Sequence, residues 1–142
     1  NKNKKILLRN PNSVRPWQHV LEPLNGYLLL AQNIHNKKIK NLEQNWNFGP
    51  NISSCKSVKF LTTYLSKHLK TKIFSEKNKS SVFEPETSIL RLSNNKSKKY
   101  LKWHPKWSIN KSLDVIIDWN KKIKYQKPYD VCIEQIKEYL RH

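Results

Sequence analysis

Glycine is scarce in this sequence of 142 residues: only Gly26 and Gly49 occur, and they lie far apart. A loop that cradles a phosphate or a dinucleotide needs several closely spaced glycines, because the backbone must approach the ligand and offer its N–H groups. The chain cannot build such a loop by itself. The two cysteines, Cys55 and Cys132, are also far apart. They indicate a reducing compartment and ordinary packing rather than a disulfide framework.

Long apolar runs are absent as well. No run approaches the roughly 20 apolar residues that a membrane helix needs, and no signal peptide is visible, so we expect a cytoplasmic protein without a membrane partner. The histidines show no metal-ligand spacing. Neither a Gly-x-Ser-x-Gly elbow nor a phosphate loop ending in Gly-Lys-Ser/Thr is present. The sequence therefore holds no recognisable set of residues that could carry out a reaction alone.

Positive charge is abundant, with 28 lysines and arginines against 10 acidic residues and a formal net charge of +18. Only Arg9, Arg15, Arg91 and Arg141 are arginines, and the lysines are spread through every segment. Proteins that bind nucleic acids cluster their basic charge and favour the planar guanidinium. We therefore do not expect nucleic acid as a partner, although a basic module that binds polyanions stays open as an alternative.

The apolar periodicity predicts an α+β fold of amphipathic helices with short strands between them. We expect helices at about residues 22–34, 53–69, 94–101, 108–123 and 130–140, and strands at 5–9, 45–48, 73–74 and 88–92. None of these strands has the Val/Ile character of a central parallel strand. Ser53 or Ser54, Ser108 and Asp130 should cap the helices that follow them. Gly26, inside the first helix, predicts a close-packing point.

The most informative segment covers residues 9–32, where a strand ends, a Pro-containing loop follows and a helix begins. Arg15 is expected in the loop, with Pro11 before it and Pro16 after it to restrict its freedom. A guanidinium fork can contact two phosphate oxygens at once, so Arg15 is our candidate for a pyrophosphate contact. The alternative is an arginine that only binds a loop carbonyl. Glu22 suits the positive end of the helix.

Taken together, the residues Arg9-Asn-Pro-Asn-Ser-Val-Arg-Pro-Trp-Gln-His-Val-Leu-Glu-Pro-Leu24 resemble the segment that marks CDP-glucose 4,6-dehydratases. These are nucleotide-sugar enzymes of the extended short-chain dehydrogenase/reductase superfamily. The resemblance continues less specifically at residues 46–50, 86–92, 99–107 and 133–140. It departs from the family pattern at Pro85, where a histidine is expected, and at Lys102, where a glycine is expected. The tryptophans of the 99–107 connector are expected in the core.

The resemblance implies that residues 1–142 are the C-terminal, nucleotide-sugar-binding portion of such an enzyme, with the Rossmann core largely missing. The N-terminal dinucleotide-binding domain would be absent. The superfamily works with a Tyr-x-x-x-Lys pair, and no tyrosine here has lysine four residues later. The portion should therefore be inactive alone and hold no catalytic residue. The intact enzyme would bind NAD mainly through the missing domain, form a homo-oligomer and convert CDP-glucose to CDP-4-keto-6-deoxyglucose for deoxysugar and O-antigen synthesis.

The resemblance also implies which residues bind CDP-glucose. Arg15 corresponds to the arginine that contacts the nucleotide diphosphate, and Leu8 and Arg9 belong to the strand beside the base. Trp17 would pack under the loop or against the nucleotide. His19 would hydrogen-bond the backbone and so fix the loop. A related nucleotide-sugar epimerase, or a dehydratase with another base preference, stays open.

Overall fold

The computed structural model describes residues 6–36, 44–69, 73–75 and 87–141. Within these residues the chain forms five helices and four short strands, which confirms an α+β arrangement. The helices are α1 (Leu21–His35), α2 (Val58–Leu69), α3 (Asn95–Leu101), α4 (Ile109–Lys122) and α5 (Pro128–Leu140). The strands are β1 (Ile6–Leu8), β2 (Val14–Pro16), β3 (Cys55–Ser57) and β4 (Ile73–Ser75), and a 3₁₀ turn at Ile52–Ser54 precedes β3.

The strands form two small pairs. β1 runs parallel to β4, and β2 runs antiparallel to β3. On its other side β2 receives residues 88–90: Val14 N donates to the Ser88 carbonyl at 2.8 Å, and Leu90 N donates to the Val14 carbonyl at 3.0 Å. The strand predicted at 88–92 is thus reduced to one bridge, between Val14 and Ile89.

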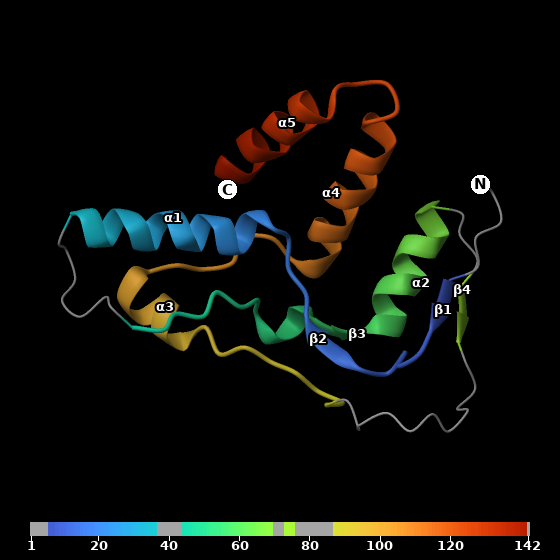
Figure 1. Cartoon of the computed structure of the whole chain (residues 1–142), viewed down its shortest axis with the longest axis horizontal. Coiled ribbons are helices and arrows are strands. Elements are labelled where there is room, and N and C mark those ends of the chain that lie inside the picture. Colours follow the sequence, from blue (N-terminus) through green and yellow to red (C-terminus); the bar gives the residue numbers. More distant parts are fainter. Residues whose placement is uncertain (1–5, 37–43, 70–72, 76–86, 142) are drawn as a thin grey trace.

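The helices pack around this central ladder (Figure 1). α4 and α5 form a hairpin that returns the C-terminal end of α5 towards α1, while α3 lies along the opposite side of α1. α2 contacts α4 and follows directly from β3. The short segment from β2 to the start of α1 therefore lies where the helical layers meet.

Three apolar clusters form the core. The first, between α1 and α3, buries Phe48, Leu101 and Trp103. The second, between α2 and α4, buries Leu61, Ile109 and Leu113. The third, where α4 and α5 meet the connector before α4, buries Trp107, Val115 and Tyr139. Trp103 is 1% exposed and Trp107 is 6% exposed. The prediction that both connector tryptophans belong to the core is confirmed.

The strand predicted at residues 45–48 is wrong, because this segment has no regular secondary structure. Side chains satisfy its carbonyls in place of a neighbouring strand. Gln18 Nε2 donates to the Phe48 carbonyl at 2.6 Å, and Ser97 Oγ donates to the Asn47 carbonyl at 2.5 Å. The aromatic pattern reflects the burial of Phe48 rather than a strand.

One of the three predicted helix caps is present in the structure. Ser108 caps α4 as expected, because its side chain accepts a hydrogen bond from Lys111 N. The cap expected at Ser53 or Ser54 is wrong: both lie in the 3₁₀ turn, and Ser57 Oγ instead accepts from Phe60 N in the first turn of α2. The Asp130 cap is also wrong, since α5 already begins at Pro128, a favoured first position for proline.

Candidate functional site

Arg15 occupies the middle of β2, half-buried, and not an irregular loop as the sequence predicts. Its Nη1 donates to the Val14 carbonyl at 2.9 Å and to the Thr87 carbonyl at 3.0 Å. These contacts tie the guanidinium to the segment that runs beside β2. The alternative weighed from the sequence, an arginine that binds a carbonyl of a neighbouring segment, is therefore seen in the structure. The same two hydrogen bonds hold the guanidinium group beside the segment that contains Thr87.

Leu8 and Arg9 lie at and just beyond the end of β1. Leu8 is half-buried and pairs with Ser75 of β4, while Arg9 is exposed. Because β1 pairs with β4 and β2 pairs with β3, Leu8 and Arg15 belong to different sheets. The turn at Asn10–Asn12 connects them, with Ser13 N donating to the Asn10 carbonyl at 3.2 Å.

Trp17 follows β2 and serves as a packing side chain. Its Nε1 donates to the Lys56 carbonyl at 2.9 Å, and its ring packs against the cluster of Leu61, Ile109 and Leu113. Of the two roles weighed from the sequence, packing under the segment that carries Arg15 is the one this geometry favours. The indole thereby links β2 and β3 to the α2–α4 layer.

His19 hydrogen-bonds the backbone at the start of α1. Its Nδ1 accepts a hydrogen bond from Leu21 N at 3.3 Å, and its ring lies edge-on to Trp107 with a centroid distance of 5.0 Å. The side chain is buried, and this burial lowers the pKa of His19 below its usual value. Nδ1 acts as the acceptor here, which requires the proton of the neutral ring to sit on Nε2.

The lowered pKa of His19 makes stability depend on pH with a defined sign. Between the folded pKa and the unfolded value of about 6.5, the unfolded chain binds more protons than the folded chain. The contribution is complete above that unfolded value and is lost as pH falls towards the folded pKa. We expect His19→Asn, whose amide oxygen can still accept from Leu21 N, to remove this component. Urea unfolding between about pH 5 and 7.5 would measure it, and equal pH profiles for both proteins would contradict it.

Glu22 carries a role that its sequence position only partly indicates. It is 0% exposed. Its carboxylate accepts from Trp107 N at 2.7 Å, from Lys106 N at 3.0 Å and from the Tyr139 hydroxyl at 2.8 Å. Burial, followed by the hydrogen bond to Glu22, raises the pKa of Tyr139, so the phenol stays a donor. Glu22 therefore joins α1, the tryptophan connector and α5, with His19 beside it.

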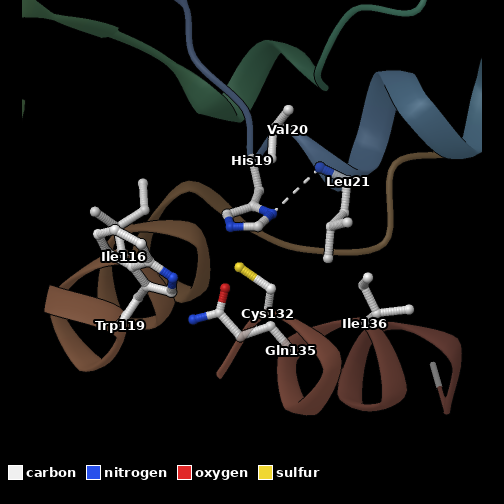
Figure 2. A pocket seen from close by; sticks show the side chains of 8 residues that line it. All are labelled: His19, Val20, Leu21, Ile116, Trp119, Cys132, Gln135 and Ile136. Carbon is white, nitrogen blue, oxygen red and sulfur yellow. Dashed lines mark hydrogen bonds between the residues drawn. The ribbon is translucent and has the colours of Figure 1, made fainter. Parts of the chain in front are cut away.

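A pocket of about 400 Å³ opens between the start of α1 and the α4–α5 hairpin. Figure 2 shows side chains from three segments around one space, among them His19, Leu21, Ile116, Trp119, Cys132 and Ile136. The lining is mostly apolar. Of the predicted site residues only His19 reaches it, so the structure does not gather the predicted residues around this pocket.

Apolar side chains are also exposed next to the pocket. Val20 directly precedes α1, and Leu24 and Leu28 follow it in α1 at four-residue spacing; the three side chains are 60%, 45% and 72% exposed. Ile116 and Ile136, from the pocket wall, are 43% and 39% exposed. We call these five residues the apolar patch. Exposed apolar side chains of this kind are typical of surfaces to which another protein segment or a ligand binds.

The two glycines are used for packing, so they do not fit the pyrophosphate of NAD. A Cβ on Gly26 would lie 2.2 Å from Phe48 Cδ1, and a Cβ on Gly49 would lie 2.7 Å from Leu92 Cβ. The close-packing role predicted for Gly26 is confirmed. Neither glycine forms a turn between a strand and a helix, and no reaction step through NAD is assigned to this chain.

Metal-binding and membrane-spanning features are both absent from the part of the chain that the structure describes. Among them, no group of three or more His, Cys, Asp and Glu side chains is placed to hold a metal ion. In the same part of the chain, every helix is too short or too polar to cross a membrane.

The fold and the arginine-bearing ladder define an α+β module in which long-range pairing presents a cationic side chain. No protein-family model matches the chain. The chain is, however, similar to CDP-glucose 4,6-dehydratase of Salmonella typhimurium, with 35% identity over 123 residues that cover 84% of this chain. The resemblance seen in the sequence is thereby confirmed. The chain spans about a third of that relative, since the match covers 33% of its length.

Proposed function

We propose that the chain is the substrate-binding portion of a nucleotide-sugar dehydratase that converts CDP-glucose to CDP-4-keto-6-deoxyglucose, and that it is inactive alone. The observation that carries this proposal is the similarity to CDP-glucose 4,6-dehydratase along 84% of the chain. The limited share of the relative that is matched supports assigning catalysis to the rest of the protein. The intact protein would be a lyase that holds NAD mainly through that remainder.

Arg15 is the proposed contact to the nucleotide diphosphate. The ladder between β2, β3 and residues 88–90 holds its backbone, and two carbonyls hold its Nη1. A guanidinium placed in advance loses little side-chain freedom when a phosphate binds. Trp17 and His19 would support this segment from the core, and backbone groups of Leu8 and Arg9 would lie beside the base.

The apolar patch gives the proposal a second element. Val20 before α1, Leu24 and Leu28 on α1, and Ile116 and Ile136 in the pocket wall would be covered by the dinucleotide-binding remainder of the same protein. That remainder accounts for about two thirds of the relative's length, because the match leaves the other part uncovered. We further propose a homo-oligomeric, cytoplasmic enzyme of deoxysugar and O-antigen synthesis.

A basic module that binds polyanions is the second candidate function, and the net charge of +18 favours it. The two candidates differ in their dependence on salt and on the base. Binding driven by diffuse lysine charge should weaken steeply with salt and tolerate any polyanion. A clamp for a cytidine nucleotide should saturate with one CDP and prefer CDP over UDP.

Replacing Arg15 by alanine tests the proposed clamp. We expect CDP to bind the variant about 2 kcal/mol more weakly, which is roughly a 30-fold rise in Kd, because one charge-assisted contact is lost. Isothermal titration of the chain with CDP would measure the change. Arg141→Ala removes the same charge at the exposed end of α5 and should leave the Kd unchanged. Equal Kd values for Arg15→Ala and the unmodified chain would remove Arg15 from the site.

A further inference from the structure

The pocket between the start of α1 and the α4–α5 hairpin is lined without charge. Its volume is about 400 Å³, and the eight described residues that line it include no lysine, arginine, aspartate or glutamate. The whole chain, by contrast, has a formal net charge of +18. Pockets of this size with a mostly apolar lining and a few polar groups are typical of small-molecule sites. An ion would lose its hydration here without gaining a charged partner, so the pocket suits an uncharged ligand.

Two polar groups of the lining come from His19 and Gln135. His19 is 7% exposed, and its Nδ1 accepts from Leu21 N, so the neutral ring carries its proton on Nε2. Gln135 Nε2 donates to the Val115 carbonyl at 2.9 Å. Within the part of the chain that the structure describes, neither His19 Nε2 nor Gln135 Oε1 has a hydrogen-bond partner. In Figure 2 the Gln135 oxygen points towards the His19 ring, with the Cys132 sulfur beside it.

The other walls of the pocket are apolar, and one of them is aromatic. Ile116 and Trp119 from α4 lie on one side, and Leu21 and Ile136 lie on the other (Figure 2). An indole ring packs well against a second flat ring. A purely aliphatic occupant would leave the donor and the acceptor of the lining unpaired, which costs free energy. The occupant that satisfies all walls is therefore flat, and it carries polar atoms of its own.

We propose that this pocket binds an uncharged, flat aromatic molecule that carries a hydroxyl or a ring amide. His19 Nε2 would donate to its oxygen, and Gln135 Oε1 would accept from its O–H or N–H. The binding would not depend on the proposed function, since His19 alone of the proposed nucleotide-binding residues reaches the pocket. A remainder of the protein that covers the apolar patch would also enclose the bound molecule, because Ile116 and Ile136 belong to both surfaces.

A thiol in the lining allows the binding of a probe, 2-naphthol, to be located. Cys132 lines the pocket, whereas the other free cysteine, Cys55, lies in β3 and does not. At about ten times its Kd, 2-naphthol should slow the alkylation of Cys132 by N-ethylmaleimide about tenfold, because the occupied pocket shields the thiol. The rate at Cys55 should stay unchanged. Mass spectrometry of peptides from timed samples measures both rates in the same protein.

Two further probes separate the polar contacts from apolar packing and from charge. Naphthalene lacks the hydroxyl and should bind about five- to tenfold more weakly than 2-naphthol, because one hydrogen-bonding group is lost. 2-Naphthoate carries a negative charge and should also bind more weakly than 2-naphthol, because the lining offers its carboxylate no cation. Attraction to the net positive charge of the chain predicts the opposite order for 2-naphthoate.

A matched pair of glutamine variants tests the assigned acceptor. Gln135→Leu should weaken 2-naphthol to about the affinity of naphthalene and leave the naphthalene Kd within about twofold. Gln126→Leu makes the same change at an exposed position after α4 and should alter neither Kd. Gln135→Met serves as a second variant if the leucine disturbs folding, which circular dichroism would report.

The proposal is overturned if 2-naphthol protects neither thiol, or protects Cys132 and Cys55 equally. Equal affinities for 2-naphthol and naphthalene would mean that the pocket accepts apolar groups alone, as it would for an aliphatic side chain from the remainder of the protein, and would remove the roles of His19 and Gln135. Tighter binding of 2-naphthoate than of 2-naphthol would assign the binding to net charge. Protection confined to Cys132, with both glutamine variants behaving as expected, supports the proposal.

Discussion

Replacing Glu22 by alanine should lower the free energy of unfolding by about 3–5 kcal/mol, because it leaves two buried donors and one half-buried donor without their acceptor. The donors are the backbone N–H groups of Lys106 and Trp107 and the hydroxyl of Tyr139. Buried donors that lose their partner cannot regain the hydrogen bond from water. Urea unfolding followed by tryptophan fluorescence would measure the loss, since Trp107 lies beside the carboxylate.

Two further variants separate this network from ordinary surface charge. Glu138→Ala removes a carboxylate from α5 that pairs with Lys111 at a partly exposed position, and it should cost at most about 1 kcal/mol. Tyr139→Phe removes only the hydroxyl that donates to Glu22 and leaves the two backbone donors paired. It should cost about 1 kcal/mol. If Glu22→Ala were no more destabilising than Glu138→Ala, the carboxylate would not hold the connector to α1.

The network also explains how α5 reaches the region of the candidate site. Tyr139 lies near the end of α5, and its hydroxyl bonds to the first turn of α1. His19 and the segment that carries Arg15 directly precede that turn. The C-terminal helix therefore stabilises the position of the predicted clamp without contacting it. A loosened α5 should weaken CDP binding through this route.

Local patterns in the sequence predict the helices well. α1, α2, α4 and α5 each place apolar residues at helical spacing, and Ser108 supplies a cap whose hydrogen bond is local. The strands are harder, because each contains three residues and pairs with a distant partner. A three-residue segment such as Val14–Pro16 has no usable periodicity, so the sequence predicts a loop around Arg15 where the structure has β2.

The residues around the candidate site also include some that local sequence indicates and some that only long-range contacts reveal. Arg15 and His19 belong to one contiguous segment, and a single stretch of sequence was enough to single them out. Glu22 gains its role from a connector more than eighty residues later in the chain. Only long-range packing reveals that role.

Gly26→Val should lower the free energy of unfolding by about 3 kcal/mol, because it inserts a side chain into filled space. A Cβ at this position would lie 2.2 Å from Phe48 Cδ1 and 2.6 Å from Cγ. The ring cannot withdraw easily, since it packs edge-on against Trp103 with a centroid distance of 5.2 Å and against Tyr27 at 5.4 Å. Helix propensity alone predicts a small rise in the free energy of unfolding, since valine is a better helix former than glycine by about a few tenths of a kcal/mol. The sign of the change therefore tests the packing directly.

The matched control for this variant is Ala31→Val, which introduces the same side chain at an exposed position of the same helix. It should cost less than about 1 kcal/mol, the size of the propensity difference. Adding Phe48→Leu to Gly26→Val should recover part of the stability, because the smaller side chain makes room for the new methyl groups. Urea unfolding of the unmodified chain, Gly26→Val, Phe48→Leu and the double variant, followed by circular dichroism, measures the coupling. A Gly26→Val variant as stable as Ala31→Val would mean that α1 and the Phe48 segment are not in close contact, and that the first core cluster is packed differently.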